Sequence, residues 1–168
     1  MKNQPKAKKQ IDQRPVDALL DEYASFHTNA ANRIISYFTI PLVSFGILAF
    51  VWSIPFPPLA FLGKNQTFIN WASFVVALTL YYYLRLSPML SYIMLFFLGV
   101  FSYVIVSLEQ HLVLAQIGLL FCILGSVGQL IGYNKEGRRP IFAQEFKFML
   151  IAPMWLFSLI LKKFKIRY

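Results

Sequence analysis

The sequence predicts an all-α integral membrane protein: four transmembrane helices, an N-terminal amphipathic helix and a C-terminal re-entrant or interfacial helix. Three observations lead to this fold class. Hydrophobic residues make up 58% of the 168 positions and charged residues only 14%, well below the roughly 25% of a soluble domain. The apolar residues gather in stretches close to the ~20 residues that cross a bilayer. The basic residues lie between these stretches and in the two tails.

The polar interruptions define the elements in order. Residues 1–15 are polar and basic, and we expect a disordered tail there, ahead of a single membrane domain over residues 16–168. Residues 16–27 predict a short amphipathic helix. Its expected apolar face consists of Ala18, Leu19, Tyr23 and Phe26. This helix is too short and too charged to span, which favours a position at the membrane interface.

Four apolar stretches predict the transmembrane helices. They cover about residues 34–54, 68–84, 89–108 and 112–132. Asn29 or Asn32 can cap the first span, and Pro41 predicts a kink inside it. The tyrosines at 81–83 predict an aromatic belt at the end of the second span. A last segment, about residues 141–161, has an apolar part too short for a comfortable span, which favours a re-entrant or interfacial helix.

The distribution of charge predicts the orientation and limits the partners. With four spans, all but Lys64 of the 16 lysine and arginine residues fall on one side. Basic residues concentrate in cytoplasmic loops, so both termini are expected in the cytoplasm of a bacterial inner membrane or of the endoplasmic reticulum. The net charge of +9 comes without a motif that reads nucleic-acid grooves. The expected partners are membrane lipids, and no nucleic acid.

Two polar clusters fall on the same predicted membrane face. The first contributes His27, Asn32 and Ser36. The second contributes Gln129, Tyr133, Glu136, Arg138 and Arg139. Within each cluster two residues are spaced i, i+4 and share a helix face. Because polar groups at membrane depth are costly and often functional, these residues are the candidates for a site.

Most of these candidates also have a structural explanation. His27 can act as a cation that stabilises the C-terminal end of the short helix. Ser36 can bond back to the carbonyl oxygen of Asn32. Gln129 can form a hydrogen bond between helices. Glu136 and the two arginines that follow it can be a solvated loop pair.

Three stretches carry a more specific pattern. The first holds Tyr23, His27, Asn32, Pro41 and Leu42. The second holds Gln129, Gly132, Tyr133, Glu136, Gly137, Arg138, Arg139 and Pro140. The third is Ala-Pro-Met-Trp-Leu at residues 152–156. Together they resemble the membrane-embedded 2-hydroxy fatty acid dioxygenases, the family of yeast phytosphingosine alpha-oxidation that was formerly labelled a domain of unknown function.

The resemblance implies an iron-dependent reaction, in which a 2-hydroxy fatty acid loses one carbon with dioxygen and ferrous iron held by histidines. Imidazole suits iron, and the metal needs open positions for oxygen and substrate. The family pattern expects three histidines, and His27 matches the first. Ser36 and Tyr133 stand at the other two positions. The implied cofactor is therefore Fe(II) if the chain is active, and none if the site is incomplete.

The resemblance also implies roles for the other candidates. Tyr23, Asn32, Tyr133 and Glu136 would serve catalysis. Arg138 and Arg139 would bind the substrate carboxylate as bidentate partners, with Gln129 beside them.

Three functions are open at this point. The chain is an iron-dependent dioxygenase of 2-hydroxy fatty acids, or a non-catalytic membrane protein that binds a lipid or partner in the inherited pocket. The third alternative is a different enzyme, in which Tyr133 and Glu136 act as acid and base. The two replaced histidine positions favour lost or altered chemistry.

Overall fold

The computed structural model describes residues 14–58, 69–137 and 142–166. These residues form six helices and no strand: α1 Pro15–Ala24, α2 Ala30–Trp52, α3 Trp71–Leu86, α4 Pro88–Glu109, α5 Leu114–Glu136 and α6 Phe142–Lys163. The all-α fold class is confirmed. The predicted tail up to residue 13, the loop with Lys64, and both Arg138 and Arg139 lie outside the described residues.

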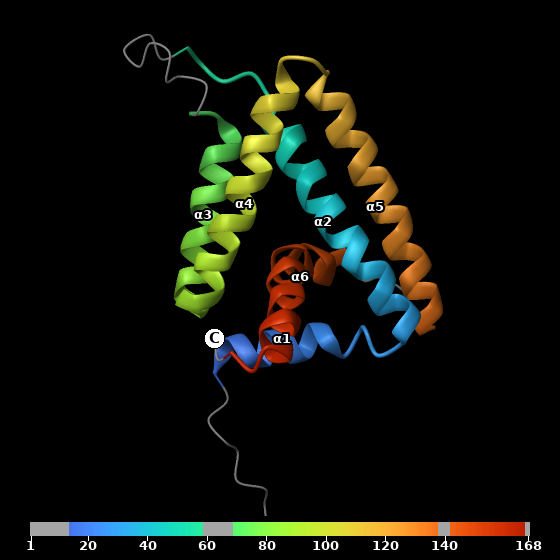
Figure 1. Cartoon of the computed structure of the whole chain (residues 1–168). Helices are drawn as coiled ribbons and strands as arrows, with labels where there is room; N and C mark the ends of the chain where they lie inside the picture. Colours follow the sequence, from blue (N-terminus) through green and yellow to red (C-terminus); the bar gives the residue numbers. More distant parts are fainter. Residues whose placement is uncertain (1–13, 59–68, 138–141, 167–168) are drawn as a thin grey trace, which may run out of the picture.

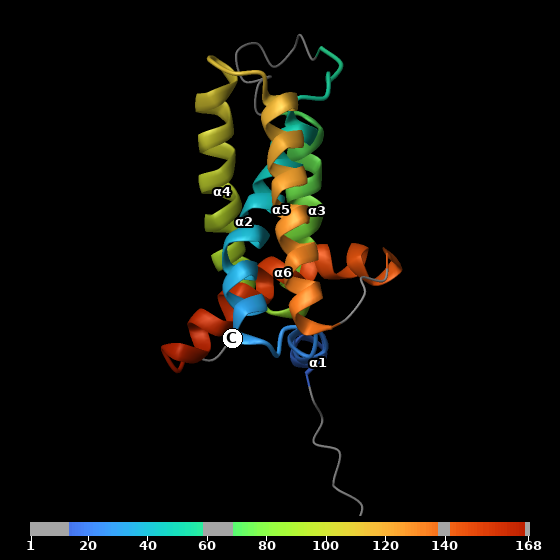
Figure 2. The ribbon, with the colours of Figure 1, turned by 90° about the vertical axis from the view of Figure 1, so that its right-hand side faces the viewer.

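Four helices form two pairs, and two more lie across one end of them. Helices α3 and α4 stand side by side on the left of Figure 1, and α2 and α5 form a second, inclined pair. Helix α1 crosses the lower end in Figure 1, and α6 crosses it in the perpendicular view of Figure 2. The two helices that were expected not to span therefore both lie across the same end of the bundle.

Three helices suit a bilayer by length and composition, namely α2, α4 and α5. Helix α3 is apolar as well but has 16 residues, which is less than the ~20 of a full span. The outer faces are strongly apolar: Leu78 is 70% exposed, Phe96 76% and Tyr103 75%. A soluble monomer rarely exposes contiguous apolar surface on this scale, so the surroundings that fit these faces are lipid tails.

The helix ends follow recognisable capping chemistry. Asn29 is the N-cap of α2, because its side chain accepts a hydrogen bond of 2.8 Å from the backbone N–H of Ala31. Helix α2 therefore begins before the predicted start at residue 34. Helix α5 continues through Glu136 and ends at Gly137, whose φ of 67° is the left-handed conformation that favours glycine. The predicted loop from residue 134 was wrong as far as residue 136.

Glycines allow α2 and α5 to pack closely along their length. A Cβ atom on Gly118 would lie 2.6 Å from the backbone nitrogen of Phe50 and 2.8 Å from the carbonyl oxygen of Gly46. A Cβ atom on Gly132 would lie 2.2 Å from Oδ1 of Asn32. Small residues permit such backbone approach between membrane helices. This packing brings the C-terminal turns of α5 beside the first turns of α2.

Two sequence expectations about side chains need correction. The predicted apolar face of α1 is confirmed for Tyr23, which is buried, and for Leu19 and Phe26, which pack against the core, but Ala18 is exposed and the other buried residues are Val16 and Leu20. Tyr83 is not part of an interfacial belt, because it is buried and its hydroxyl donates a hydrogen bond of 2.5 Å to the carbonyl oxygen of Leu150. That carbonyl lies in the turn of α6 before Pro153, where the missing proline N–H loosens the helical bonding.

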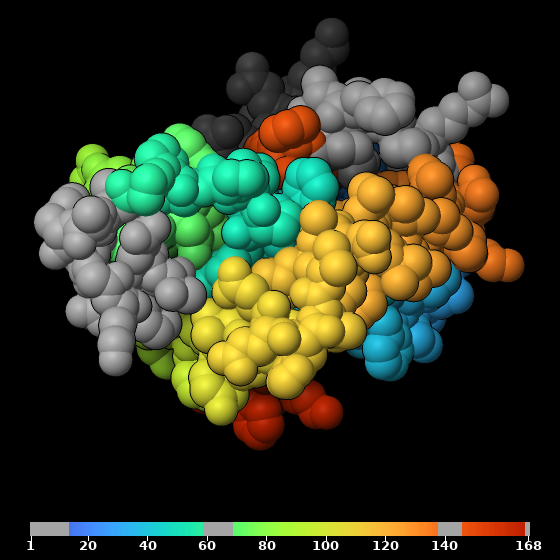
Figure 3. Space-filling model, turned by 90° about the horizontal axis from the view of Figure 1, so that it is seen from above, coloured from blue at the N-terminus to red at the C-terminus, as the bar shows by residue number. Residues whose placement is uncertain are grey.

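The two ends of the bundle differ in charge. Every lysine and arginine among the described residues lies just before α1, in α6 and its C-terminal extension, or at the ends of α2, α3 and α5 that adjoin these helices (Figure 1). The opposite end contains the residues that follow α2 and the turn from α4 to α5, and Figure 3 looks onto it. In the described part of that end, Glu109 is the one charged side chain.

We predict that Gly118→Ala destabilises the protein, because the new methyl group meets backbone atoms that side-chain rotation cannot move. Overpacking of this kind costs about 1–3 kcal/mol. The change is measurable as a lower unfolding temperature in mild detergent. Gly99→Ala is the matched control, since a Cβ atom there meets nothing within 4 Å. Equal unfolding temperatures for the two variants would contradict the close α2–α5 packing.

Candidate functional site

The two predicted polar clusters meet at the end of the bundle where α1 and α6 lie. Tyr23 is in the last turn of α1, and His27 lies in the connection from α1 to α2. Asn32 and Ser36 are in the first turns of α2, and Tyr133 and Glu136 in the last turns of α5. All are buried except Glu136, which is half-buried. We refer to these six residues as the polar cluster: Tyr23, His27, Asn32, Ser36, Tyr133 and Glu136.

His27 lies among aromatic rings. Its ring stacks on Tyr23 with centroids 4.4 Å apart, and the centroids of Trp155 and Tyr133 are 5.0 and 6.4 Å away. Its Nδ1 atom is 3.1 Å from the carbonyl oxygen of Tyr23 in the last turn of α1. Because that oxygen only accepts, the hydrogen bond requires the proton on Nδ1. His27 therefore bonds the last turn of α1 through a ring N–H, whereas the expected role of a histidine cation at that helix end is not supported, because burial lowers the pKa of His27.

The surroundings of His27 favour its neutral form. Burial lowers the pKa of His27 below the ordinary histidine value, and the cation of Arg33 acts in the same direction. The carbonyl of Tyr23 and the carboxylate of Glu136 oppose this shift in pKa without cancelling it. For a charged imidazolium, the free energy lost by desolvation here would exceed the free energy gained from its neighbours.

Glu136 connects the end of α5 to the start of α2. Its Oε1 accepts hydrogen bonds from the backbone N–H of Asn29 at 2.7 Å and from Nδ2 of Asn32 at 3.2 Å. Its Oε2 accepts one from the hydroxyl of Thr28 at 2.8 Å. Nδ2 of Asn29 also donates to the carbonyl oxygen of Lys135 at 3.2 Å. Both carboxylate oxygens of Glu136 thus accept hydrogen bonds from the α1–α2 connection and the first turn of α2.

Asn32 is bonded on several sides. Its Nδ2 donates to the carbonyl oxygen of Phe26 at 3.0 Å as well as to Glu136. Its backbone carbonyl oxygen accepts a hydrogen bond of 2.9 Å from the Ser36 hydroxyl. This is the structural explanation for Ser36 that the sequence offered. The side chain is 2% exposed, so losing one partner would leave a buried polar group unsatisfied.

The polar cluster does not fit the three-histidine iron site that the resemblance implies. His27 is the only histidine at the three expected positions. The Ser36 hydroxyl is used by the Asn32 carbonyl, and a neutral hydroxyl is a weak ligand for ferrous iron. Across residues 14–58, 69–137 and 142–166, no three His, Cys, Asp or Glu side chains gather so that they could hold a metal ion.

The remaining predicted residues are not part of the polar cluster as the structure describes it. Gln129 is half-buried on α5, and its side chain makes no hydrogen bond within the described residues. The expected interhelical bond of Gln129 is therefore absent from that part of the chain. Arg138 and Arg139 lie outside the described residues, so their expected roles stay predictions.

Sequence reasoning missed three members of the neighbourhood as parts of a site. Thr28 is a short polar residue in a connection, and no spacing marks it as a partner of Glu136. Asn29 was recognisable only as a helix cap. Trp155 belongs to the third motif stretch, yet its contact with His27 follows from the way α6 crosses the bundle (Figure 2).

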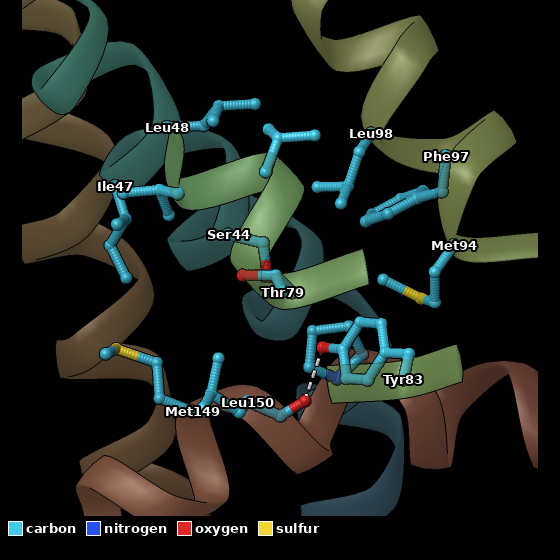
Figure 4. Close-up of a pocket in the computed structure, with 13 residues that line it drawn as sticks. Ser44, Ile47, Leu48, Thr79, Tyr83, Met94, Phe97, Leu98, Met149 and Leu150 are labelled. Atoms are coloured by element: carbon cyan, nitrogen blue, oxygen red, sulfur yellow. Dashed lines mark hydrogen bonds between the residues drawn. The ribbon is translucent and has the colours of Figure 1, made fainter. Parts of the chain in front are cut away.

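An apolar cavity lies near the polar cluster, between α2, α3, α4 and α6. Figure 4 shows its walls, which include Leu48, Phe97, Leu98 and Met149. Its volume is about 120 Å³. The hydroxyl of Tyr83 is turned to the carbonyl of Leu150 (Figure 4). Helix α6 contributes to both places, because Trp155 contacts His27 and the preceding turns line this apolar cavity.

Comparison of the chain with protein-family models, curated proteins and solved structures finds no match.

We predict that acid destabilises the protein through His27. The unfolded chain takes up a proton near pH ~6.5, whereas buried His27 does so only at lower pH, so stability falls as the pH drops below that value. The loss is at most about 1.4 kcal/mol per pH unit. It is measurable as the unfolding temperature between pH ~7.5 and ~5.5, the range in which histidine titrates.

His27→Phe should flatten this pH profile, because it removes the group that titrates. His111→Phe is the control, since His111 is exposed on the turn between α4 and α5. A wild-type profile that His27→Phe leaves unchanged would show that His27 is not held neutral.

Proposed function

We propose that this chain is a divergent member of the 2-hydroxy fatty acid dioxygenase family that keeps the scaffold and binds a fatty-acid-like lipid without the family's iron site. The observation that carries the proposal is the meeting of the two motif stretches. His27 and Asn32 come from the first, Tyr133 and Glu136 from the second, and they lie in one neighbourhood. Residues about a hundred positions apart are thus joined where the family pattern has its chemistry.

The contacts within the polar cluster support the loss of the iron reaction. A metal site needs side chains whose lone pairs are free and face one point. Here Ser36 donates to Asn32, and both oxygens of Glu136 accept hydrogen bonds from the start of α2. These polar groups stabilise one another, which is a structural role. The same engagement of Glu136 argues against an acid–base pair with Tyr133.

The apolar cavity supports lipid binding. Its lining is almost entirely apolar, and the hydroxyls of Ser44 and Tyr83 are turned to backbone carbonyls. The volume of about 120 Å³ is smaller than the roughly 300–1,000 Å³ of typical ligand pockets. The cavity therefore holds part of an acyl chain, and the remainder of the acyl chain lies along the outer helix faces. Arg138 and Arg139 would meet the lipid carboxylate.

The proposal includes a topology. Helices α2 to α5 cross the bilayer, and α1 and α6 lie at its cytoplasmic face together with both termini. The support is the gathering of the described lysines and arginines at the end where α1 and α6 lie, because cytoplasmic segments carry an excess of these residues. A bacterial inner membrane and the endoplasmic reticulum both present such a face.

The second candidate is the family's reaction itself, Fe(II)-dependent shortening of a 2-hydroxy fatty acid by one carbon. One observation favours it: the Glu136 carboxylate is near enough to influence the ionisation of His27. A histidine and a carboxylate are two ligands of the kind that non-haem iron uses. Glu136 would have to leave its present partners to serve in this way, so this candidate ranks second.

We predict that protein purified in mild detergent contains no stoichiometric iron and still binds a 2-hydroxy fatty acid. The Ser36→His, Tyr133→His double variant should gain iron, because it restores imidazole at the two replaced positions. Elemental analysis measures the metal, and retention of an isotope-labelled 2-hydroxy fatty acid measures the lipid.

His27→Ala is the control for the metal measurement, since it removes the one histidine of the polar cluster. Near-stoichiometric iron in the natural protein that disappears in His27→Ala would contradict the proposal and establish the second candidate. Absence of iron from both the natural protein and the double variant would contradict the family scaffold. Failure of the natural protein to retain the fatty acid would contradict lipid binding.

A further inference from the structure

A second hollow lies between α2 and α6, apart from the polar cluster and the apolar cavity. Its volume is about 390 Å³, and we refer to it as the α2–α6 groove. It is lined by Tyr37, Leu156, Leu159, Ile160 and Lys163. None of these residues belongs to the polar cluster or lines the apolar cavity. The groove is therefore a separate place from the polar cluster and the apolar cavity.

One face of α6 forms most of the groove wall. Its four lining residues follow the spacing i, i+3, i+4, i+7, which is a single helix stripe. Three of them are aliphatic, and the fourth, Lys163, stands in the last turn of α6. The volume of the α2–α6 groove falls within the roughly 300–1,000 Å³ of ligand pockets. The groove thus combines apolar walls with one cation at the end of the helix.

The charge at this end of the groove has no acidic counterpart. Lys163 is exposed, and among the described residues it makes no hydrogen bond or salt bridge. Arg33 lies one turn before Tyr37 on α2, hence on the same helix face, and is exposed as well. No carboxylate lines the groove. An amphipath with an apolar tail and an anionic head complements both features.

Stabilisation of the helix end accounts for a lysine here but not for the groove. Cations in the last turn favour the helix macrodipole, and Lys162 supplies that effect equally well. The macrodipole does not require an aliphatic hollow beside the cation. An acidic peptide would match Lys163, but it would leave its own backbone against the apolar wall.

We infer that the α2–α6 groove binds one anionic phospholipid of the surrounding membrane. An acyl chain lies against Leu156, Leu159 and Ile160, and the lipid phosphate meets the ammonium of Lys163. The long apolar stem of the lysine follows the wall while its charged head stays at the interface. The lipid joins the C-terminal half of α6 to the first half of α2.

The test is lipid retention after reconstitution. The protein is placed in phosphatidylcholine vesicles that contain a minor fraction of phosphatidylserine and is extracted in mild detergent, and mass spectrometry counts the lipids that remain bound. The natural protein should be enriched in phosphatidylserine. Lys163→Gln should reduce this enrichment about fivefold, the equivalent of about 1 kcal/mol for one cation at an anionic surface. Leu159→Trp should reduce retention of both lipids by filling the groove.

Lys135→Gln is the matched control, because Lys135 is an exposed lysine in the last turn of α5 and does not line the groove. It should leave the enrichment unchanged. The inference is overturned if the natural protein shows no preference for phosphatidylserine, or if Lys163→Gln and Lys135→Gln behave alike. It is also overturned if Leu159→Trp retains as much lipid as the natural protein.

Discussion

The carboxylate of Glu136 is the constraint on which the rest of the structure depends. It stands in the last turn of α5, beside the start of α2. Its two oxygens accept hydrogen bonds from Thr28, from the backbone of Asn29 and from Asn32. These partners are in place only if α2 begins beside the last turn of α5. The glycine contacts between the two helices permit that approach, and the α1–α2 connection then directs α1 and His27 toward α6.

This arrangement gives the polar cluster a structural role of its own. A buried polar network is stable when every member is satisfied, and partly satisfied networks are expensive. Asn32, Ser36 and Glu136 satisfy one another or nearby backbone groups, and His27 is held neutral among aromatic rings. The network therefore keeps a stabilising role whether or not chemistry takes place there. The lipid binding proposed above uses the apolar cavity, whose lining includes no member of this network.

Composition and spacing predicted the helices well, because long apolar stretches and polar interruptions depend on local sequence alone. The cap at Asn29 and the bond from Ser36 to Asn32 were also predictable, since both join residues within one turn. The partners of Glu136 were not, because Arg138 and Arg139 lie close to it in the sequence, whereas its actual partners are more than a hundred positions away. The burial of Tyr83 and the contact of Trp155 with His27 depend on where α6 crosses, which no local pattern records.

The most direct test of this account is the coupling energy between Asn32 and Glu136. It is obtained from the free energies of unfolding of Asn32→Ala, Glu136→Ala and the double variant. The account predicts a coupling of about 0.5–3 kcal/mol, as for contacting residues of one network. The pair Asn32→Ala and Glu109→Ala serves as the reference. Glu109 is the last residue of α4, at the end of the bundle away from Asn32. Additive effects of Asn32→Ala and Glu136→Ala, within about 0.3–0.5 kcal/mol, would contradict the account.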